Sequence, residues 1–504
     1  MKCFLGVDIG SVSTKFVLID QKGEVLYSTY FRTEGDPIGS LKKGLRWLEE
    51  FIKSQGKDIE ISGLATTGSG RYLASAVLGA DIIKNEITAH AKGVTHFMPE
   101  ARTVIEIGGQ DSKIIILENG AAVDFAMNLL CLKGDAKITT NPSYNPTPIR
   151  EIRIGKRVLT HQGRFMPVEQ VYERRYKGRM IEIEVPNVGK LEITPEHPVW
   201  GLKRNEVAVC KLAEQANCKK QHTKQRELSW QPTPIPAKEL REGDFVIIPL
   251  SGFKKRFCDF ISQEKKQDYR FFIHKNWLFA PIRRIRRYQF EGPVYNLRVK
   301  GDSSYVANFV GVHNCAAGTG AFLDAQAFRL GIPVEKFGEF ALRSKNPTII
   351  SSRCTVFAES DMIHKQQVGH KVEDIIAGLC QGMARNYLAG VARGKKINPP
   401  IVFLGGVSEN VGMRWAFKEE LKQEIIVPKY NKVMGALGAA LLVRESPPQK
   451  TRFRGFAVSE KEIRTTSFIC QGCPNHCEVI EARIEGKVVA RWGDRCGRWS
   501  NLKY

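Results

Sequence analysis

Apolar residues gather in short runs of strand length, and two parts of the chain follow the same plan. FLGVDIG (4–10) ends in Asp and Gly, and STKFVLID (13–20) follows before a Gln-Lys-Gly turn. TVIEIGGQDSKIIIL (103–117) repeats this order, with an Asn-Gly turn before AAVDFAM. Asn-Gly between apolar runs is a strong hairpin signal. The pattern therefore predicts two similar hairpins, with Asp8 and Asp111 at their Gly-rich bends.

A third Gly-rich strand end follows a segment of helical period. The helical spacing is carried by Val372, Ile375, Ile376, Leu379 and Met383. IVFLGGVSEN (401–410) then reads as a strand that ends in Gly-Gly. Loops of this kind can surround phosphates, while carboxylates at the bends hold a metal ion or a water. The chain has no G-x-x-x-x-G-K-[ST] and no G-x-G-x-x-G after its first strand, which excludes a P-loop and a Rossmann site.

These three strand ends, in this order, resemble the actin/Hsp70/sugar-kinase ATPase superfamily. The resemblance implies an α/β fold of two RNase H-like halves, with a first phosphate loop at 8–15, a second at 106–113 and an adenosine loop at 404–408. It implies that ATP and Mg²⁺ bind close to Asp8 and Asp111. The other residues expected to bind nucleotide are Gly10, Ser11, Ser13, Thr14, Lys15, Gly108, Gly109, Gln110, Gly318, Thr319, Gly320, Gly405 and Gly406.

Two further motifs narrow the resemblance. CAAGTGAFLD (315–324) and SSRCTVFAES (351–360) resemble the activator ATPases of 2-hydroxyacyl-CoA dehydratases and benzoyl-CoA reductases. In that family each subunit supplies two cysteines to one 4Fe–4S cluster at a homodimer interface, which implies Cys315 and Cys354 as ligands here. Two thiolates per chain do not complete a four-thiolate site, so a dimer follows. Cys3 and Cys380 lack such flanking motifs, and we expect them to be buried in apolar cores.

The family resemblance also implies partners and an activity. The expected activity is ATP-driven one-electron donation to a CoA-ester dehydratase or reductase, with a ferredoxin- or flavodoxin-like protein as electron donor. The alternative is a kinase of the same superfamily that phosphorylates a sugar or an acid. Cluster cysteines have no role in such a kinase.

An insert, residues 131–314, separates FAMNLL (125–130) from CAAGTG, which should almost directly follow it in this family. The insert begins at Cys131 and contains Thr194 and His197 in a T-x-x-H arrangement. It ends in His313-Asn314, immediately before Cys315. This combination resembles an intein of the Hint fold. No LAGLIDADG-like repeat is present, so the expectation is a mini-intein.

The chemistry of splicing explains these residue types. Cys131 attacks the carbonyl of the preceding residue to form a thioester, while Thr194 and His197 hold and protonate the departing amide nitrogen. Cys315 accepts the acyl group, and Asn314 cyclises with help from His313. The ligated product joins residues 1–130 directly to 315–504. Ser303-Ser304 and Asn296 stand where many inteins have His and Asp, which we expect to slow steps. The alternative, a Hint protein that only cleaves, is disfavoured because Asn314 and Cys315 are both present.

Charge sets the insert apart from the rest of the chain. Residues 131–314 carry 34 Lys and Arg against 19 Asp and Glu, a net +15 of the chain's +23. The basic residues are scattered and form no recognisable nucleic-acid module, so they predict a solvated surface without a specific nucleic-acid partner. No apolar run approaches the length of a membrane span, and MKCFLGVDIG lacks the pattern of an export signal. We therefore expect a cytoplasmic protein that does not bind a membrane.

The twelve cysteines of such a protein favour metal or reactive sites over disulfides. After Pro447-Pro448 a polar linker is expected at about 445–466, between the second ATPase part (315–444) and a Cys-rich module (467–504). The first ATPase part is expected at 1–130. The module's Cys-x₂-Cys-x₃-Cys and distant Cys suit a second iron–sulfur cluster or zinc, with His476 as a substitute ligand. Its four expected ligands are Cys470, Cys473, Cys477 and Cys496.

Overall fold

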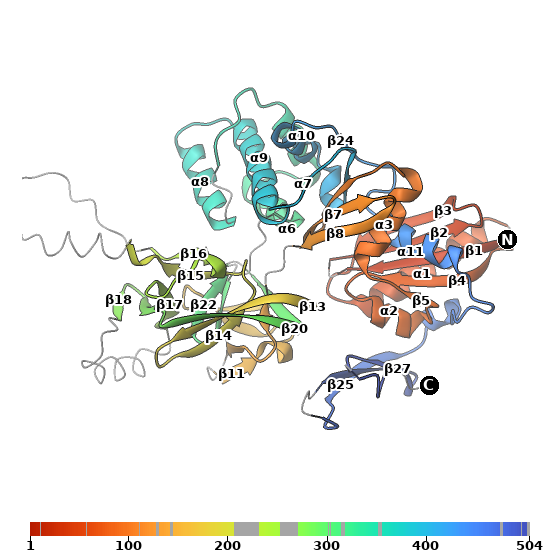
Figure 1. The fold of residues 1–504 in the computed structure, drawn as a ribbon, viewed down its shortest axis with the longest axis horizontal. Helices are drawn as coiled ribbons and strands as arrows, with labels where there is room; N and C mark the ends of the chain where they lie inside the picture. The colour runs from red at the N-terminus through yellow and green to blue at the C-terminus, as the bar shows by residue number, and fades with distance from the viewer. Residues whose placement is uncertain are drawn as a thin grey trace, which may run out of the picture. The chain divides into compact units, whose positions relative to one another are not determined.

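The chain folds as two compact units, residues 1–127 with 316–504 and residues 128–315 (Figure 1). The computed structural model describes all residues except 11, 57, 110, 128–130, 142–144, 206–230, 252–270, 301, 303, 314–317, 351–354, 474–476, 495 and 501–504. Five of the predicted site residues lie outside the described residues: Ser11, Gln110, Asn314, Cys315 and Cys354. The insert is predicted at 131–314, so the second unit begins three residues earlier and ends one residue later than that prediction.

The first half of the larger unit is built on a five-stranded sheet of order β3-β2-β1-β4-β5. β1, β2 and β3 form an antiparallel meander, and β4 and β5 add in parallel. The strands are β1 (Lys2–Ile9), β2 (Ser13–Asp20), β3 (Val25–Arg32), β4 (Glu60–Thr67) and β5 (Ile82–Ile83). Helix α1 (Pro37–Ser54) connects the meander to β4.

The second half repeats this plan in a sheet of order β8-β7-β6-β23-β24. Again three strands form an antiparallel meander and two add in parallel. The strands are β6 (Thr103–Ile107), β7 (Ser112–Glu118), β8 (Ala121–Met127), β23 (Ile401–Leu404) and β24 (Ile425–Ile426). The insert therefore interrupts the second half after its third strand, at the connection that α1 makes in the first half. The predicted α/β fold of two similar halves is confirmed.

Close helix packing holds the strand that carries Asp8. Helix α11 (Met434–Glu445) lies against β1, where a Cβ on Gly6 would come within 1.9 Å of the carbonyl oxygen of Ala436. The same helix lies against α3 (Glu86–Phe97), where a Cβ on Gly438 would come within 1.7 Å of the Ala89 carbonyl. Only glycine fits at these two contacts.

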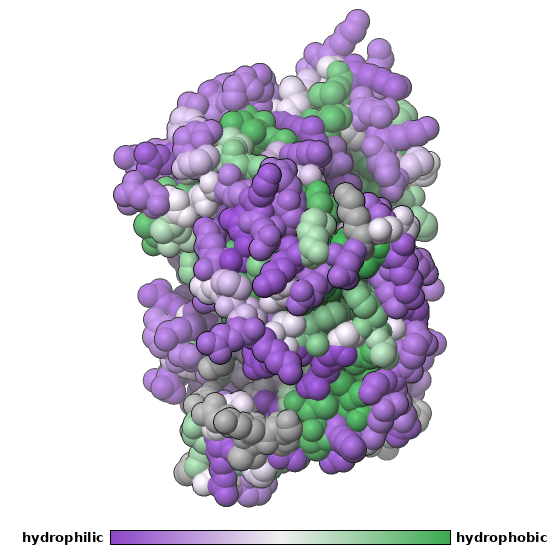
Figure 2. Space-filling view, turned by 90° about the vertical axis from the view of Figure 1, so that its right-hand side faces the viewer, coloured by the Kyte–Doolittle hydropathy of each residue, from purple (hydrophilic) through white to green (hydrophobic). Residues whose placement is uncertain are grey.

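The predicted helix around residues 372–383 is confirmed as α9 (Val372–Gly390), which buries Ile375, Ile376, Leu379 and Met383. The other helices of this unit are α2 (Arg71–Leu78), α6 (Gly320–Leu330), α7 (Val334–Leu342), α8 (Thr355–Gln367) and α10 (Val411–Leu421). Among the described residues, no helix is long and apolar enough to cross a membrane. Hydrophilic side chains dominate the face drawn in Figure 2.

The described residues of the insert are mainly strands, as the sequence predicts. Fourteen strands form one sheet, in which β13 and β20 pair from Val168 opposite Val299 to Glu184 opposite Arg284. The strands are β9 (Leu132–Lys133), β10 (Lys137–Thr140), β11 (Asn145–Pro148), β12 (Arg157–Leu159), β13 (Phe165–Val185), β14 (Gly189–Ile193), β15 (Pro198–Leu202), β16 (Thr233–Pro236), β17 (Phe245–Pro249), β18 (Phe272–His274), β19 (Trp277–Pro281), β20 (Arg284–Val299), β21 (Ser304–Ala307) and β22 (Val310–His313).

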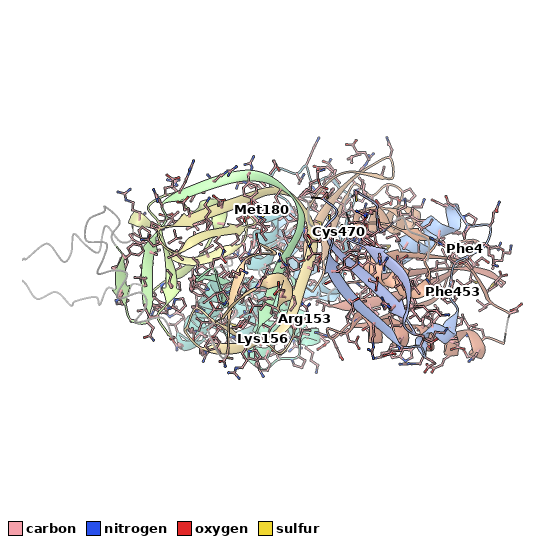
Figure 3. The ribbon with its side chains drawn as sticks, turned by 90° about the horizontal axis from the view of Figure 1, so that it is seen from below. Phe4, Arg153, Lys156, Met180, Phe453 and Cys470 are labelled. Carbon is pink, nitrogen blue, oxygen red and sulfur yellow. The ribbon has the colours of Figure 1, made fainter. Side chains whose placement is uncertain are left out.

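The C-terminal segment forms a small antiparallel sheet of β25 (Ile463–Ile469), β26 (Glu478–Ile484) and β27 (Lys487–Trp492). β25 begins inside the stretch predicted as a linker, 445–466. Its residues are largely polar and exposed, so its composition resembles that of a linker although its backbone is paired. Cys470, labelled in Figure 3, directly follows β25.

Candidate functional sites

The first hairpin places a buried ion pair at its bend. Asp8 on β1 lies opposite Lys15 on β2, and the Lys15 ammonium is 3.1 Å from the Asp8 carboxylate. Burial works against the charged ammonium, but Asp8, Tyr30 and Glu106 outweigh it and raise the pKa of Lys15. Gly10 donates its N–H to the Ser13 carbonyl at 2.9 Å, which closes the turn. The bend thus presents a fixed cation and a fixed carboxylate.

The second hairpin carries a denser charge cluster. The Lys113 ammonium lies 2.8 Å from Glu106, 3.2 Å from Asp111 and 3.3 Å from Glu86. Burial opposes its charge, yet the three carboxylates hold the pKa of Lys113 well above its ordinary value. The lysine is therefore charged and offsets part of the negative charge at this bend.

The predicted nucleotide loops meet one another. A Cβ on Gly109 would come within 2.9 Å of Val12, so the two bends face each other closely. The carbonyls of Gly108 and Gly109 accept the N–H groups of Gly320 and Ala321, at 2.9 and 2.8 Å. The loop that follows the insert is thereby bound to the second phosphate loop.

The predicted adenosine loop joins the same group of loops. Gly405 has a φ of +86°, and a Cβ there would lie 2.3 Å from the Ile107 carbonyl and 2.9 Å from the Glu106 carboxylate. Its N–H bonds to the Asn431 carbonyl at 3.1 Å. Glycine-rich loops thus lie around Asp8, Lys15 and Asp111. This arrangement suits the binding of a phosphate chain together with Mg²⁺.

Glu106 and Lys113 were not recognised from the sequence as site residues. Both are buried, at 6% and 2% exposure, within strands made largely of apolar residues. A charged residue beside isoleucines in each of the two strands that flank a Gly-rich bend is the signal that could have identified them. Their pairing across β6 and β7, Glu106 opposite Lys113, depends on the register of the hairpin.

The insert holds its first residue at the T-x-x-H motif. The Cys131 N–H donates to the Thr194 hydroxyl at 2.9 Å, and the Thr194 N–H donates to the Cys131 carbonyl at 2.9 Å. The His197 N–H bonds to the Thr194 carbonyl at 3.1 Å, which closes a turn. Cys131, Thr194 and His197 are all buried. The nitrogen held by Thr194 is the one that leaves if the peptide bond before Cys131 becomes a thioester.

Two of the predicted histidines lie at the ends of neighbouring strands of the insert: His197 directly precedes β15, and His313 is the last residue of β22. Val199 on β15 pairs with Val312 on β22, which brings His197 and His313 to the same region. Burial lowers the pKa of each to about 3, and for His197 the backbone near Cys131 and His313 partly opposes this effect. Both imidazoles are therefore neutral near pH 7.

A third histidine, His161, was missed by sequence reasoning. Its ring stacks on Trp200 with centroids 3.9 Å apart, and the Trp200 ring lies 5.7 Å from that of His313. Its Nδ1 lies 2.6 Å from the Ser304 hydroxyl. Burial lowers its pKa to about 4. No motif marks this histidine in the sequence, because the strands that surround it are far apart along the chain.

The C-terminal cysteines are partly brought together. The Cys470 N–H donates to the Cys477 carbonyl at 2.8 Å, and the Cys470 sulfur accepts the Gly472 N–H at 3.4 Å and the Trp499 indole N–H at 3.2 Å. Within the described part of the chain, no three His, Cys, Asp or Glu side chains are arranged to hold a metal ion. His476 lies outside that part.

Cys3 and Cys380 are fully buried, as expected. Burial raises the pKa of Cys3 to about 11 and that of Cys380 to about 12, so both thiols are protonated near neutral pH.

Comparison with known proteins gives a family match. The model of the BadF/BadG/BcrA/BcrD ATPase family matches residues 5–141 and 296–443, which is more than half of the chain. The 2-hydroxyisocaproyl-CoA dehydratase activator of Clostridioides difficile is 43% identical over 135 residues, 27% of this chain and 50% of the relative. The (R)-2-hydroxyglutaryl-CoA dehydratase activating ATPase of Acidaminococcus fermentans is 40% identical over 140 residues, 28% and 54% of the two chains. The chain thus spans about half the length of these relatives.

Two solved structures match different parts of the chain. The activator of the 2-hydroxyisocaproyl-CoA dehydratase from Clostridium difficile with bound ADPNP matches with 22% identity and a TM-score of 0.46, covering 88% of this chain and 95% of its own. A DnaB intein from Synechocystis sp. PCC 6803 matches with 13% identity and a TM-score of 0.24, covering 37% of this chain and 98% of its own.

We expect the insert to lose stability as the pH falls below 6.5. His161 and His197 are kept neutral by burial, with pKa values of about 4 and about 3 against an ordinary 6.5. At pH values between the folded pKa of each histidine and 6.5, the unfolded chain binds more protons than the folded chain. The stability of the insert therefore rises with pH in this range and is lost on acidification. Each imidazole costs about 1.4 kcal/mol per pH unit until its folded pKa is reached.

The measurement is hydrogen exchange of an unspliced Cys131→Ala, Asn314→Ala full-length chain at pH 7 and pH 5, corrected for intrinsic exchange rates. Peptides from 131–313 should lose protection at pH 5, and a His197→Gln variant should lose less. Equal protection at both pH values would contradict the burial of neutral imidazoles.

Proposed function

We propose that this chain, which belongs to the BadF/BadG/BcrA/BcrD ATPase family, is a precursor. An intein removes itself from the precursor and leaves an ATP-dependent activator. The spliced product hydrolyses ATP and donates single electrons to a CoA-ester dehydratase or reductase. The observation that supports the splicing step best is the hydrogen bond from the Cys131 N–H to Thr194. The observation that supports the ATPase step best is the meeting of the Gly-rich bends around Asp8 and Lys15.

Splicing begins at Cys131. Its sulfur attacks the carbonyl carbon of Leu130, a C–S bond replaces the C–N bond, and the proton lost by the thiol is delivered to the departing nitrogen. Thr194 already holds that nitrogen through its N–H at 2.9 Å. His197 is neutral and buried beside it, so it acts as a hydrogen-bond donor and relay rather than as a permanent cation.

The later steps use the residues at the other junction. The Cys315 sulfur takes the acyl group from Cys131, which joins the first ATPase part to the second through a thioester. The side-chain nitrogen of Asn314 then attacks its own carbonyl carbon and releases the amine of Cys315. That amine captures the acyl group, and a peptide bond between Leu130 and Cys315 results. A protein that only cleaves would have no use for Cys315, so splicing is the preferred function.

ATP hydrolysis is assigned to the site between the bends. Lys15 would supply a fixed cation for the phosphates, and the backbone of Gly109 lies close to Val12 of the first bend. Asp8 and Asp111 would hold Mg²⁺ or orient the attacking water, and Mg²⁺ when bound would neutralise developing phosphate charge. Lys113 keeps Asp111 and Glu106 in place.

The electron-transfer role rests on the family resemblance of the motifs around Cys315 and Cys354. These two cysteines and their counterparts in a second copy would hold a 4Fe–4S cluster, which supplies one-electron chemistry when bound. A ferredoxin- or flavodoxin-like donor would reduce it. A sugar or acid kinase of the same superfamily remains the alternative, and an iron–sulfur chromophore in the anaerobically purified protein distinguishes the two.

A second metal site is proposed at Cys470, Cys473, Cys477 and Cys496, for iron–sulfur or zinc. The indole N–H of Trp499 donates to the Cys470 sulfur, and the backbone N–H of Gly472 does the same. These two donors, Trp499 foremost, lower the pKa of Cys470 and favour the thiolate that a metal needs.

Expression of the full-length chain should yield two products, because both junctions carry their nucleophiles. One is a ligated protein in which residues 1–130 are joined to 315–504, and the other is the free insert, residues 131–314. Intact-mass spectrometry measures both. Cys131→Ala should abolish the ligated product, and Asn314→Ala should stop the release of the insert. Cys380→Ala, which removes a buried thiol elsewhere, is the matched control and should splice normally. Wild-type chain that stays at full length for days with reductant would disprove splicing.

The spliced protein should hydrolyse ATP. Asp8→Asn and Asp111→Asn should each lower turnover by about two orders of magnitude, because each removes a charge that holds Mg²⁺ or the attacking water. Asp58→Asn, at an exposed position of the same unit, is the control. Phosphate release by the purified dimer is the readout. Turnover like that of wild type in both variants would show that the bends are not the nucleotide site.

The insert should control formation of the shared cluster, because Cys315 directly follows it. An unspliced Cys131→Ala, Asn314→Ala chain that ends before Cys470 should contain little iron, whereas the spliced chain with the same end should contain about four irons per dimer. Iron and acid-labile sulfide analysis after anaerobic purification measures this. A full iron complement in the unspliced chain would show that Cys315 is available before splicing.

A further inference from the structure

His161 is a buried, hydrogen-bonded histidine inside the insert. It lies in the turn between β12 and β13, where the Thr160 N–H bonds to the Arg164 carbonyl at 2.9 Å. The residue is 7% exposed. The Nδ1 of its ring lies 2.6 Å from the Ser304 hydroxyl, and its backbone N–H donates to the same hydroxyl at 3.2 Å. Two contacts to one hydroxyl fix both the backbone and the ring of His161.

The surrounding contacts hold this turn in place. Asp302 accepts the Thr160 hydroxyl at 2.5 Å and the Arg164 Nε at 2.8 Å. The indole N–H of Trp277 donates to the His161 carbonyl at 2.7 Å. Asp302 and Arg164 are the charged groups that act on the imidazole, with opposite effects on its pKa. These contacts tie the turn that carries His161 to Asp302 and Trp277.

The ring of His161 is coupled to His313 through two routes. The Trp200 ring stacks on it at 3.9 Å and 6°, and the ring of His313 lies 5.7 Å from that of Trp200, at 47°. Ser304, which binds Nδ1, lies directly opposite His313 in the β21–β22 ladder. His161 therefore contacts both the aromatic and the backbone neighbour of the residue that precedes Asn314.

We propose that His161 is the positioning residue for cyclisation of Asn314. It acts through Trp200 and Ser304 on His313, and it takes the place of the histidine that many inteins carry near Ser303-Ser304. In this step the Asn314 side-chain nitrogen bonds to the Asn314 carbonyl carbon, the peptide bond to Cys315 breaks, and a proton passes from the amide to the new amine. The inference rests on the proposed splicing function and concerns only its second junction.

The step can be isolated in the full-length chain. Cys131→Ala prevents the first step, and cleavage between Asn314 and Cys315 then reports cyclisation alone. In this background His161→Ala should slow cleavage by more than about tenfold. His161→Phe, which keeps the stack on Trp200, and Ser304→Ala, which removes only the hydroxyl, should each slow it by less. His161→Ala with Ser304→Ala should be no slower than His161→Ala, because the two residues act as one unit.

The first junction provides the control for folding. In an Asn314→Ala chain, dithiothreitol releases residues 1–130 only if the thioester at Cys131 has formed. His161→Ala should change the rate of this thiolysis by less than about twofold, whereas a merely structural role would slow both reactions. His274→Ala, on β18, controls for the loss of a histidine and should change neither.

Three results would overturn the inference. Cleavage at the parental rate in His161→Ala would show that His161 is not needed. Equal loss of cleavage and thiolysis in His161→Ala, His161→Phe and Ser304→Ala would assign it a structural role. Absence of cleavage in the Cys131→Ala parent, with intact folding by hydrogen exchange, would overturn the proposed second step itself. That last outcome is distinguishable because it does not depend on His161.

Discussion

The pairing of Gly320 with Gly108 is the constraint on which the ATPase unit depends. The Gly320 N–H donates to the Gly108 carbonyl at 2.9 Å, which binds the chain after the insert to the predicted phosphate loop before it. Met127, the last residue of β8, lies opposite Lys113, beside that loop. Both ends of the interruption therefore leave the same end of one sheet. In the proposed ligated product only 128–130 and 315–317 connect Met127 to Gly318, and a short link would be sufficient because the two ends already lie at the same end of the sheet.

The same arrangement limits where an insert can enter this fold. The second half requires a connection between its third and fourth strands, and the first half makes that connection with α1. An insert at this point leaves every strand pair of both sheets intact, so the ATPase can fold around it. In the proposed sequence of events, the sulfur of Cys315 has two tasks. It must accept an acyl group before it can bind iron. Thiolate chemistry suits both tasks, since a thiolate is at once a good nucleophile and a good ligand.

The parts of this molecule that sequence reasoning predicted are those set by local pattern. Neighbouring residues determine the Gly-rich bends, the helical period of α9 and the strands of the insert. The buried pair of Glu106 and Lys113 depends on hairpin register, and His161 meets Ser304 across a separation of 143 residues. No local pattern encodes such contacts. The start of β25 was missed for the opposite reason, because an exposed paired strand has the composition of a linker.

The proposed role of His161 illustrates how a missing motif residue need not mean a missing function. An imidazole near His313 can come from any strand that the sheet brings to that place, since its geometry depends on position in space and not on position in the chain. Here the turn after β12 carries it, and Asp302 holds that turn by binding Thr160 and Arg164. Asp302 belongs to the segment in which many inteins carry the histidine. The segment thus keeps the proposed task of placing an imidazole, although the ring comes from the turn between β12 and β13.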